Sequence, residues 1–370
     1  MGPRLRAVIV GWLLLLAACG GTDEQATTTT TYNPPSTVAS TTTLPARGLS
    51  GAGPGLVVVR CVGGTSYSVS VLDMATARQR GEVRFDVPYD RARPRFGCNP
   101  RPPWALRASF NAVFDELAVT AKQPNGSSHV AAWGAGGKDT VDLTPPDNAY
   151  GSVVLHYDPL FQPTTGHLWF LADDKPKRET TLMRLVERSG GVPRSVTPWP
   201  TLNANGPPLS FVFGPKTDWA VTWEEGRAPL PNPSARIAAA GDWQVLRRDS
   251  NAWASVAVTG DRRGECEPQA WVDDHRLLCL DTPGRQVVRL VSYSADYATA
   301  EVRPLLPEAS RTTTTGLVVS PAGDEYAFVS VQGGVGGVYS VFRQSLAGGE
   351  PVKVTDIEGT WLNVMPLEWR

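Results

Sequence analysis

The sequence is poor in the side chains that most often carry out catalysis. Its 370 residues include only four histidines, and none of them lies in a recognisable catalytic motif. The chain has no Gly-x-Ser-x-Gly motif of a hydrolase nucleophile and no glycine-rich phosphate loop followed by a helix. It also has no Cys-x-x-Cys pair or Cys/His cluster that would bind zinc. We therefore predict no metal and no cofactor, and an enzyme is the less favoured interpretation.

An excess of charge of either sign is also missing. The chain has 35 Lys and Arg against 36 Asp and Glu, a formal net charge of -1, so we do not expect a nucleic-acid partner. Hydrophobic residues make up 41% of the sequence, enough for a large core. The 36 Gly and 32 Pro are spread along the chain and would interrupt most helices. Together these features predict an all-β protein with many turns.

The apolar run near the N-terminus is too short to cross a membrane. It covers ten residues, 7–16, whereas a bilayer needs about 20. Because Arg4 and Arg6 precede it, the run fits the hydrophobic region of a signal peptide. The next residues, Leu-Ala-Ala-Cys at 16–19, resemble the bacterial lipoprotein signal, in which small residues precede a cysteine that is lipidated and becomes the new N-terminus.

That resemblance implies a signal peptide over residues 1–18 and a lipid, palmitate included, on Cys19. The mature protein would then be anchored at the extracytoplasmic face of the cell membrane, since several acyl chains make a lasting tether. An ordinary secretory signal cleaved after Ala18 is the alternative.

Residues 19–50 have the composition of a disordered tether. Thr, Ser and Pro dominate the segment, and large apolar residues are almost absent, so burial cannot offset the entropy of ordering it. An extended segment of about 30 residues would reach about 90 Å from the membrane. Whether its threonines are O-glycosylated stays open. The folded domain is expected over residues 51–370.

The stretch from Leu317 to Thr355 predicts four short strands joined by tight turns. The strands are expected at 317–320, 326–331, 338–344 and 352–355, with glycine-containing turns or loops between them. Four antiparallel strands of this kind form one blade of a β-propeller. A Ser-Pro-x-Gly turn, a Phe-bearing strand and a Gly-Gly-x-Pro turn, in this order, closely resemble the repeat of TolB-type β-propellers. Ala322 stands where that family usually has Asp.

Weaker copies of this pattern recur about every 50 residues, at 108–144, 155–197, 211–226 and 267–293. Residues 55–87 match the last three strands of a blade, and the tail Val364–Trp369 supplies a first strand. We predict a six-bladed β-propeller closed by pairing the C-terminal strand with the N-terminal blade, because an open ring would leave unpaired strand edges. Seven blades, a β-sandwich and two smaller β domains are the alternatives.

Four cysteines remain in the exported chain, and they allow three disulfide pairings. Cys266 and Cys279 flank a predicted hairpin around Asp273-Asp274, so we expect them to lie near each other. Cys61 and Cys98 would then pair by elimination in an oxidising compartment. Four buried thiols are the alternative.

The segment 89–104 is the candidate site for partner binding. It carries four arginines and one acid, Asp90, and it ends in a Trp that follows two prolines. We expect its residues to present a basic patch to an anionic partner, such as lipid head groups or an acidic wall polymer: Arg91, Arg93, Arg95, Arg101 and Trp104. A solvated, variable loop is the alternative.

These features favour a monomeric module that binds or scaffolds a protein or a cell-envelope partner. The second hypothesis is a glycan-active enzyme or lectin that uses the central opening of the propeller. Its candidate acids are three adjacent pairs, Asp173-Asp174, Glu224-Glu225 and Asp273-Asp274.

Overall fold

The computed structural model describes residues 48–63, 65–95, 103–123, 127–137, 141–144, 154–162, 165–174, 179–185, 194–195, 202–203, 210–213, 219–224, 242–249, 252–255, 267–280, 287–295, 300–306, 313–332, 338–357 and 364–370. The chain divides into two units, and all of these residues belong to the second, Thr41–Arg370. The predicted signal peptide, Cys19 and most of the predicted tether lie outside the described residues. Within the described part, no helix has the length and apolar character needed to span a membrane.

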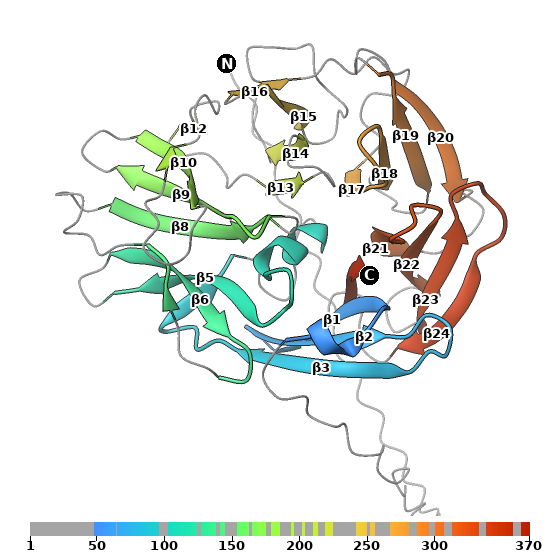
Figure 1. Cartoon of the computed structure of the whole chain (residues 1–370), viewed down its shortest axis with the longest axis horizontal. Coiled ribbons are helices and arrows are strands. Elements are labelled where there is room, and N and C mark those ends of the chain that lie inside the picture. The colour runs from blue at the N-terminus through green and yellow to red at the C-terminus, as the bar shows by residue number, and fades with distance from the viewer. Residues whose placement is uncertain are drawn as a thin grey trace, which may run out of the picture. The chain divides into compact units, whose positions relative to one another are not determined.

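The described chain is almost entirely antiparallel β-structure, so the all-β prediction is confirmed (Figure 1). Its strands form six sheets, and two short 3-10 helices, η1 (Ser50–Ala52) and η2 (Pro103–Ser109), lie outside them. The first sheet has the order β25-β1-β2-β3 and contains β1 (Leu56–Gly63), β2 (Ser66–Leu72), β3 (Gln79–Asp86) and β25 (Val364–Trp369). The second sheet contains β4 (Ala92–Pro94), β5 (Glu116–Lys122), β6 (Ser128–Gly134) and β7 (Val141–Asp142).

The other four sheets also follow chain order. The third contains β8 (Val154–Phe161), β9 (Leu168–Asp174), β10 (Glu179–Leu185) and β11 (Arg194–Ser195), and β12 (Leu202–Asn203) pairs with β10. The fourth contains β13 (Ser210–Phe213), β14 (Trp219–Glu224), β15 (Asp242–Asp249) and β16 (Ala252–Ser255). The fifth contains β17 (Glu267–Trp271), β18 (Arg276–Leu280), β19 (Val288–Tyr293) and β20 (Ala300–Leu306). The sixth contains β21 (Thr313–Val319), β22 (Glu325–Gln332), β23 (Val338–Ser345) and β24 (Val352–Ile357), close to the four predicted strands.

The strands form where apolar residues alternate with polar ones. In β3, Gly81, Val83 and Phe85 are buried, while the residues between them face outward or are partly exposed. This period of two places one set of side chains on the core face of a sheet. The largest hydrophobic cluster collects such residues from several sheets, including Val57 of β1 and Leu117 of β5.

The C-terminal strand pairs with the first strand of the chain, as the sequence predicts. β25 runs antiparallel to β1, with Leu56 opposite Trp369 and Val59 opposite Met365. Pro366 has no N–H to donate, and it lies in a strand at the edge of its sheet, where proline is tolerated. Beyond the strands, Gly55 and Arg370 exchange two backbone hydrogen bonds of 2.6 and 3.0 Å. Both ends of the described chain therefore belong to one sheet.

The helix η2 lies against strands of five different sheets. It contacts β5, β8, β13, β21 and β25. Its residues Leu106 and Ala108 are buried in the largest hydrophobic cluster, together with Phe110 and Phe114 just after the helix. The ring of Phe110 lies 5.3 Å from that of Phe85 and 6.0 Å from that of Tyr67, measured between centroids. The helix is thus anchored by aromatic packing against the first sheet.

The start of the second sheet differs from the start of the repeat copy at 108–144. Ala108 lies in η2, and Phe110 makes only an isolated bridge to Leu117. The first strand of the second sheet is instead β4, which lies inside the candidate binding segment 89–104. Burial decides this outcome, because Ala92 and Pro94 face the core on either side of Arg93.

Candidate functional site

Four exposed residues, Tyr89, Arg91, Arg93 and Lys122, form a cluster that we call the basic patch. A turn holds its first part, since the N–H groups of Arg91 and Ala92 both donate to the Pro88 carbonyl at 3.0 Å. β4 then pairs with β5, so that the Lys122 N–H donates to the Arg91 carbonyl at 2.9 Å. The patch is therefore built on two paired strands.

Tyr89 lies at the centre of the basic patch. Its side chain is 58% exposed, one of the few large apolar groups left in solvent among the described residues. The guanidinium carbon of Arg93 lies 4.3 Å from the ring centroid, and the Lys122 ammonium lies 5.5 Å from it. Both distances are within the range of a cation–π interaction, about 6 Å. The ring thus holds two positive charges within about 10 Å of each other.

Arg95 does not share the exposed position of Arg91 and Arg93. It is half-buried, and its Nη1 donates to the Asp158 carbonyl of β8 at 3.5 Å. Burial lowers the pKa of Arg95 from its ordinary value, and the nearby charge of Asp158 opposes this shift. Arg95 therefore connects the segment after β4 to the third sheet. Arg101 lies outside the described residues, and of Trp104 only the backbone is described, in η2.

Sequence reasoning missed Lys122, because 30 residues of chain lie between it and Arg91. Only the register of β4 and β5, with Ala92 opposite Ala121, brings the two together. Tyr89 did carry a signal, since an aromatic residue among arginines is typical of binding surfaces for anions.

A second polar cluster connects η2 to the C-terminal strand. The Arg107 Nε donates to a Glu368 carboxylate oxygen at 2.6 Å, and both side chains are largely buried. The Arg107 guanidinium also lies 4.5 Å from the centroid of the Phe114 ring. Burial lowers the pKa of Arg370, which shares this region with Arg107 and Glu368. This cluster fixes η2 to β25 and leaves Glu368 paired rather than available for acid–base chemistry.

The adjacent acids proposed for glycan chemistry lie at different ends of their strands. Asp173 and Glu224 lie at or next to the last residue of β9 and β14, the second strands of their sheets. Asp273 lies before β18, the second strand of the fifth sheet. Burial opposes ionisation of Asp273, but hydrogen bonds from the His275 N–H and from Arg276 outweigh it and lower the pKa of its carboxyl. Asp273 is thus an ionised turn residue.

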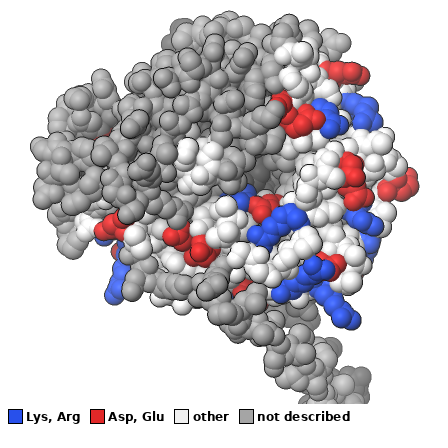
Figure 2. All heavy atoms as spheres, in the orientation of Figure 1, with Lys and Arg blue, Asp and Glu red and all other residues white. Residues whose placement is uncertain are grey.

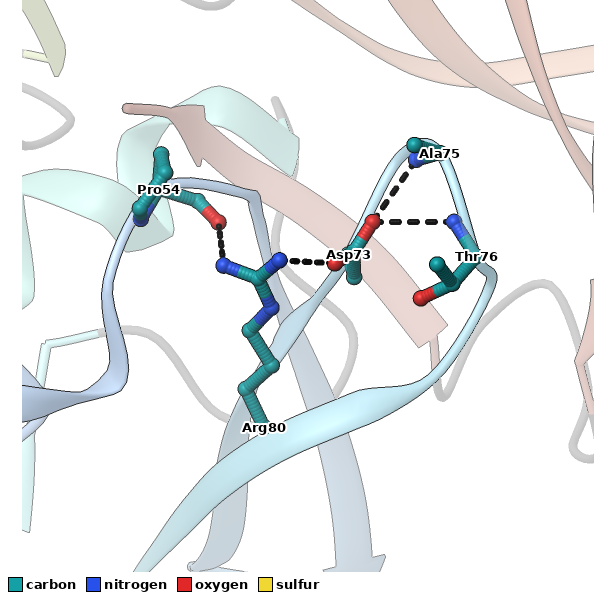
Figure 3. Close-up of polar contacts among 5 residues, drawn as sticks. All are labelled: Pro54, Asp73, Ala75, Thr76 and Arg80. Atoms are coloured by element: carbon teal, nitrogen blue, oxygen red, sulfur yellow. Dashed lines mark hydrogen bonds and ion pairs between the residues drawn. The ribbon is translucent and has the colours of Figure 1, made fainter.

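Another carboxylate, Asp73, holds the turn between β2 and β3 (Figure 3). One of its oxygens accepts hydrogen bonds from the N–H groups of Ala75 and Thr76, at 2.8 and 2.9 Å. Its other oxygen pairs with Arg80, whose Nη1 donates to the Pro54 carbonyl at 3.2 Å. The backbone donors of Thr76 and Ala75, followed by Arg80, lower the pKa of Asp73 to about 2. This arrangement connects the hairpin to the start of β1 and is structural.

Two of the four histidines are buried between sheets. The rings of His129 in β6 and His156 in β8 have centroids 6.5 Å apart, and the His156 ring packs 5.1 Å from that of Phe170. In the described ranges, no group of three or more His, Cys, Asp and Glu residues is placed to hold a metal ion.

The predicted hairpin around Asp273 is present, as β17 pairs with β18. Cys279 is fully buried in β18, and Cys61 is buried in β1. Their predicted partners, Cys266 and Cys98, lie outside the described residues, so both disulfides stay predictions.

The sequence matches no family model and no curated protein. Among solved structures, the chain is similar to a protein described as TolB from Agrobacterium tumefaciens, with 14% identity, 68% of this chain and 80% of that chain covered, and a TM-score of 0.40. It is also similar to TolB from Acinetobacter baumannii, with 13% identity, 84% and 71% covered, and a TM-score of 0.39. An oligogalacturonate lyase in complex with manganese has 13% identity, 83% and 76% covered, and a TM-score of 0.47. We transfer no activity or partner from these proteins.

Proposed function

We propose that the chain is a lipid-anchored, extracytoplasmic, six-bladed β-propeller that binds or scaffolds a protein or cell-envelope partner. Six antiparallel sheets in the described part of the chain, five of them built from consecutive strands, support the blade count, because a four-stranded meander is the unit of a propeller. The pairing of β25 with β1 supports closure, because it covers the edge that β1 would otherwise expose.

The position of η2 is the observation that favours binding over catalysis. In a propeller, the first strand of each blade lines the central opening. The helix contacts β8, β13, β21 and β25, which are the first strands of four sheets. In a propeller, a helix in this position, buried through Leu106 and fixed through Arg107, would lie in the opening that the glycan hypothesis would use for catalysis.

The arrangement of the acids limits which of them a glycosidase could use. Its two carboxyl groups must lie about 5–9.5 Å apart. The second strands of all blades run in the same sense along the propeller axis, so Asp173 and Glu224 belong to one face and Asp273 to the other. Strands of five to seven residues separate the two faces by about 13–20 Å, which is too far for Asp273 to share a reaction with Asp173 or Glu224.

The anchoring part of the proposal rests on the sequence around Cys19. Cys19→Ala should release the protein from the membrane fraction, because the lipid is the only attachment proposed and a single surface contact holds weakly. Fractionation of cells that express either form measures this release. Unchanged membrane retention of the variant would contradict the anchor.

The binding role is tested by affinity capture of the full chain from a detergent extract of native membranes. We expect a partner, either protein or polymer, in an amount comparable to that of the bait. Recovery of the bait alone would count against a scaffold and reopen the enzyme hypothesis.

A further inference from the structure

The cations of the basic patch have no carboxylate partner among the described residues. Several other charged groups of the described chain are paired, such as Arg84 with Glu82 and Lys353 with Asp356. Figure 2 shows the same tendency, since basic and acidic side chains lie next to one another over the described part of that face. Within the described ranges, no ion pair joins Arg91, Arg93 or Lys122 to a carboxylate, although Asp90 lies next to Arg91 in the chain. Their charge is therefore available to an external anion.

The patch is also held in place before any ligand binds. The pairing of β4 with β5 fixes its backbone, and the Tyr89 ring restrains the side chains of Arg93 and Lys122. Binding then costs less side-chain entropy than it would for free cations on a loop. Two like charges within about 10 Å repel each other, and an anion placed between them removes that repulsion.

The patch and the start of the described chain lie at opposite ends of β5. The Leu49 N–H donates to the Val113 carbonyl at 2.8 Å. Residues 48–49 therefore lie beside the segment that leads into β5. Lys122 is the last residue of β5, and a strand of seven residues spans about 20 Å. The tether thus joins the domain at the end of β5 that is far from the patch.

We propose that the basic patch binds a phosphodiester polymer of the cell envelope through its phosphate groups. This inference rests on the proposed function, because it requires that the domain lies outside the cell. The guanidinium groups of Arg91 and Arg93 donate in a fixed fork, and Lys122 supplies a point charge beside them. A phosphate offers oxygens in a tetrahedral arrangement that donors approach from several directions, whereas a carboxylate offers two oxygens in one plane. A polymer repeats this group and engages neighbouring cations together.

The test is a titration of the full chain, purified in neutral detergent, with polyphosphate of defined length. The measurement uses about 0.1 M salt, where the Debye length is about 10 Å. The variant Arg91→Gln/Arg93→Gln/Lys122→Gln should raise the Kd about tenfold, the order expected when three exposed ion pairs are lost. Because all three side chains are exposed, we expect the variant to fold like the wild type. Circular dichroism and the urea unfolding midpoint check this.

A matched control removes the same charge from other exposed positions. The variant Arg78→Gln/Arg84→Gln/Lys353→Gln should change the Kd by about twofold or less, because these residues lie outside the patch. Tyr89→Leu should raise the Kd about threefold, since it keeps every charge but removes the ring that holds Arg93 and Lys122.

Three results would overturn the proposal. An equal loss of affinity in the control variant would show unspecific attraction. Equally tight binding of poly-glutamate, with the same sensitivity to the patch variant, would assign the patch to an acidic peptide. Binding to phosphatidylglycerol vesicles without binding to polyphosphate would assign it to the membrane. The titration needs neither the lipid on Cys19 nor a captured partner. A negative titration would therefore refute only the phosphate ligand, and the affinity capture would still test the proposed binding role.

Discussion

Deletion of the last eight residues, 363–370, should unfold the domain. The deletion removes β25, whose side chains Val364, Met365 and Leu367 are at most 5% exposed. Burial of each contributes about 1.5–3 kcal/mol, so their loss amounts to about 5–9 kcal/mol. Most domains are stable by only about 5–15 kcal/mol. The shortened chain also loses the Arg107–Glu368 ion pair and exposes the edge of β1.

Urea unfolding followed by tryptophan fluorescence measures this effect. We expect the shortened protein to be unfolded or aggregated without urea, or to unfold at a much lower urea concentration. Deletion of residues 27–43 in the predicted tether is the matched control and should leave the unfolding midpoint unchanged. A synthetic peptide of residues 363–370 should restore part of the stability when added to the shortened protein. A cooperative transition at the wild-type midpoint after the tail deletion would refute the role given to β25.

Two further predictions concern the region around β1 and its hairpin. Gly55→Ala should destabilise the fold by about 1–3 kcal/mol, because the new Cβ would lie 2.5 Å from the Leu72 carbonyl oxygen. Gly51→Ala, where a Cβ meets nothing within 4 Å, is the control in the same urea assay, and equal midpoints for the two variants would contradict the crowding argument. Asp73 has a pKa of about 2 in the fold, against about 3.9 in unfolded chains, so its contribution to stability is complete above about pH 4 and is lost as the pH falls to about 2. Asp73→Asn should flatten the fall of the urea midpoint over this pH range, and an unchanged slope would show that other groups cause the fall.

Much of the fold could be predicted because its sheets have strong local signals. In the sixth sheet, glycine and proline turns separate short runs of β-branched and aromatic residues, and these runs became β21 to β24. The pairing of β25 with β1 followed from a simple count, since residues 55–87 supply three strands and the tail supplies one.

The second sheet was harder to predict, because its first strand is only three residues long. Ala92–Pro94 is too short to show alternation, while the equally short run Ala108–Phe110 stands at the start of a repeat copy in the sequence. That run is held in η2 and in the packing of Phe110 against the first sheet. These contacts join residues far apart in the chain, and local patterns do not contain them.

The candidate site could be predicted only in part, for a similar reason. The arginines of segment 89–104 were visible in the sequence, but alternation in β4 exposes Arg93 and directs its neighbours to the core. Lys122 joined the patch through strand register alone. The density of arginines in the sequence indicated the region of the basic patch. The pairing and alternation of the strands determine which side chains are exposed there.

The most direct test of the proposed binding role is the stoichiometry of the material captured with the full chain from detergent-extracted native membranes. We expect a protein or polymer partner in amounts comparable to the bait, retained through washing at about 0.1 M salt. Recovery of the chain without a partner, across extracts from several growth conditions, would show that the chain is not a binding or scaffolding module.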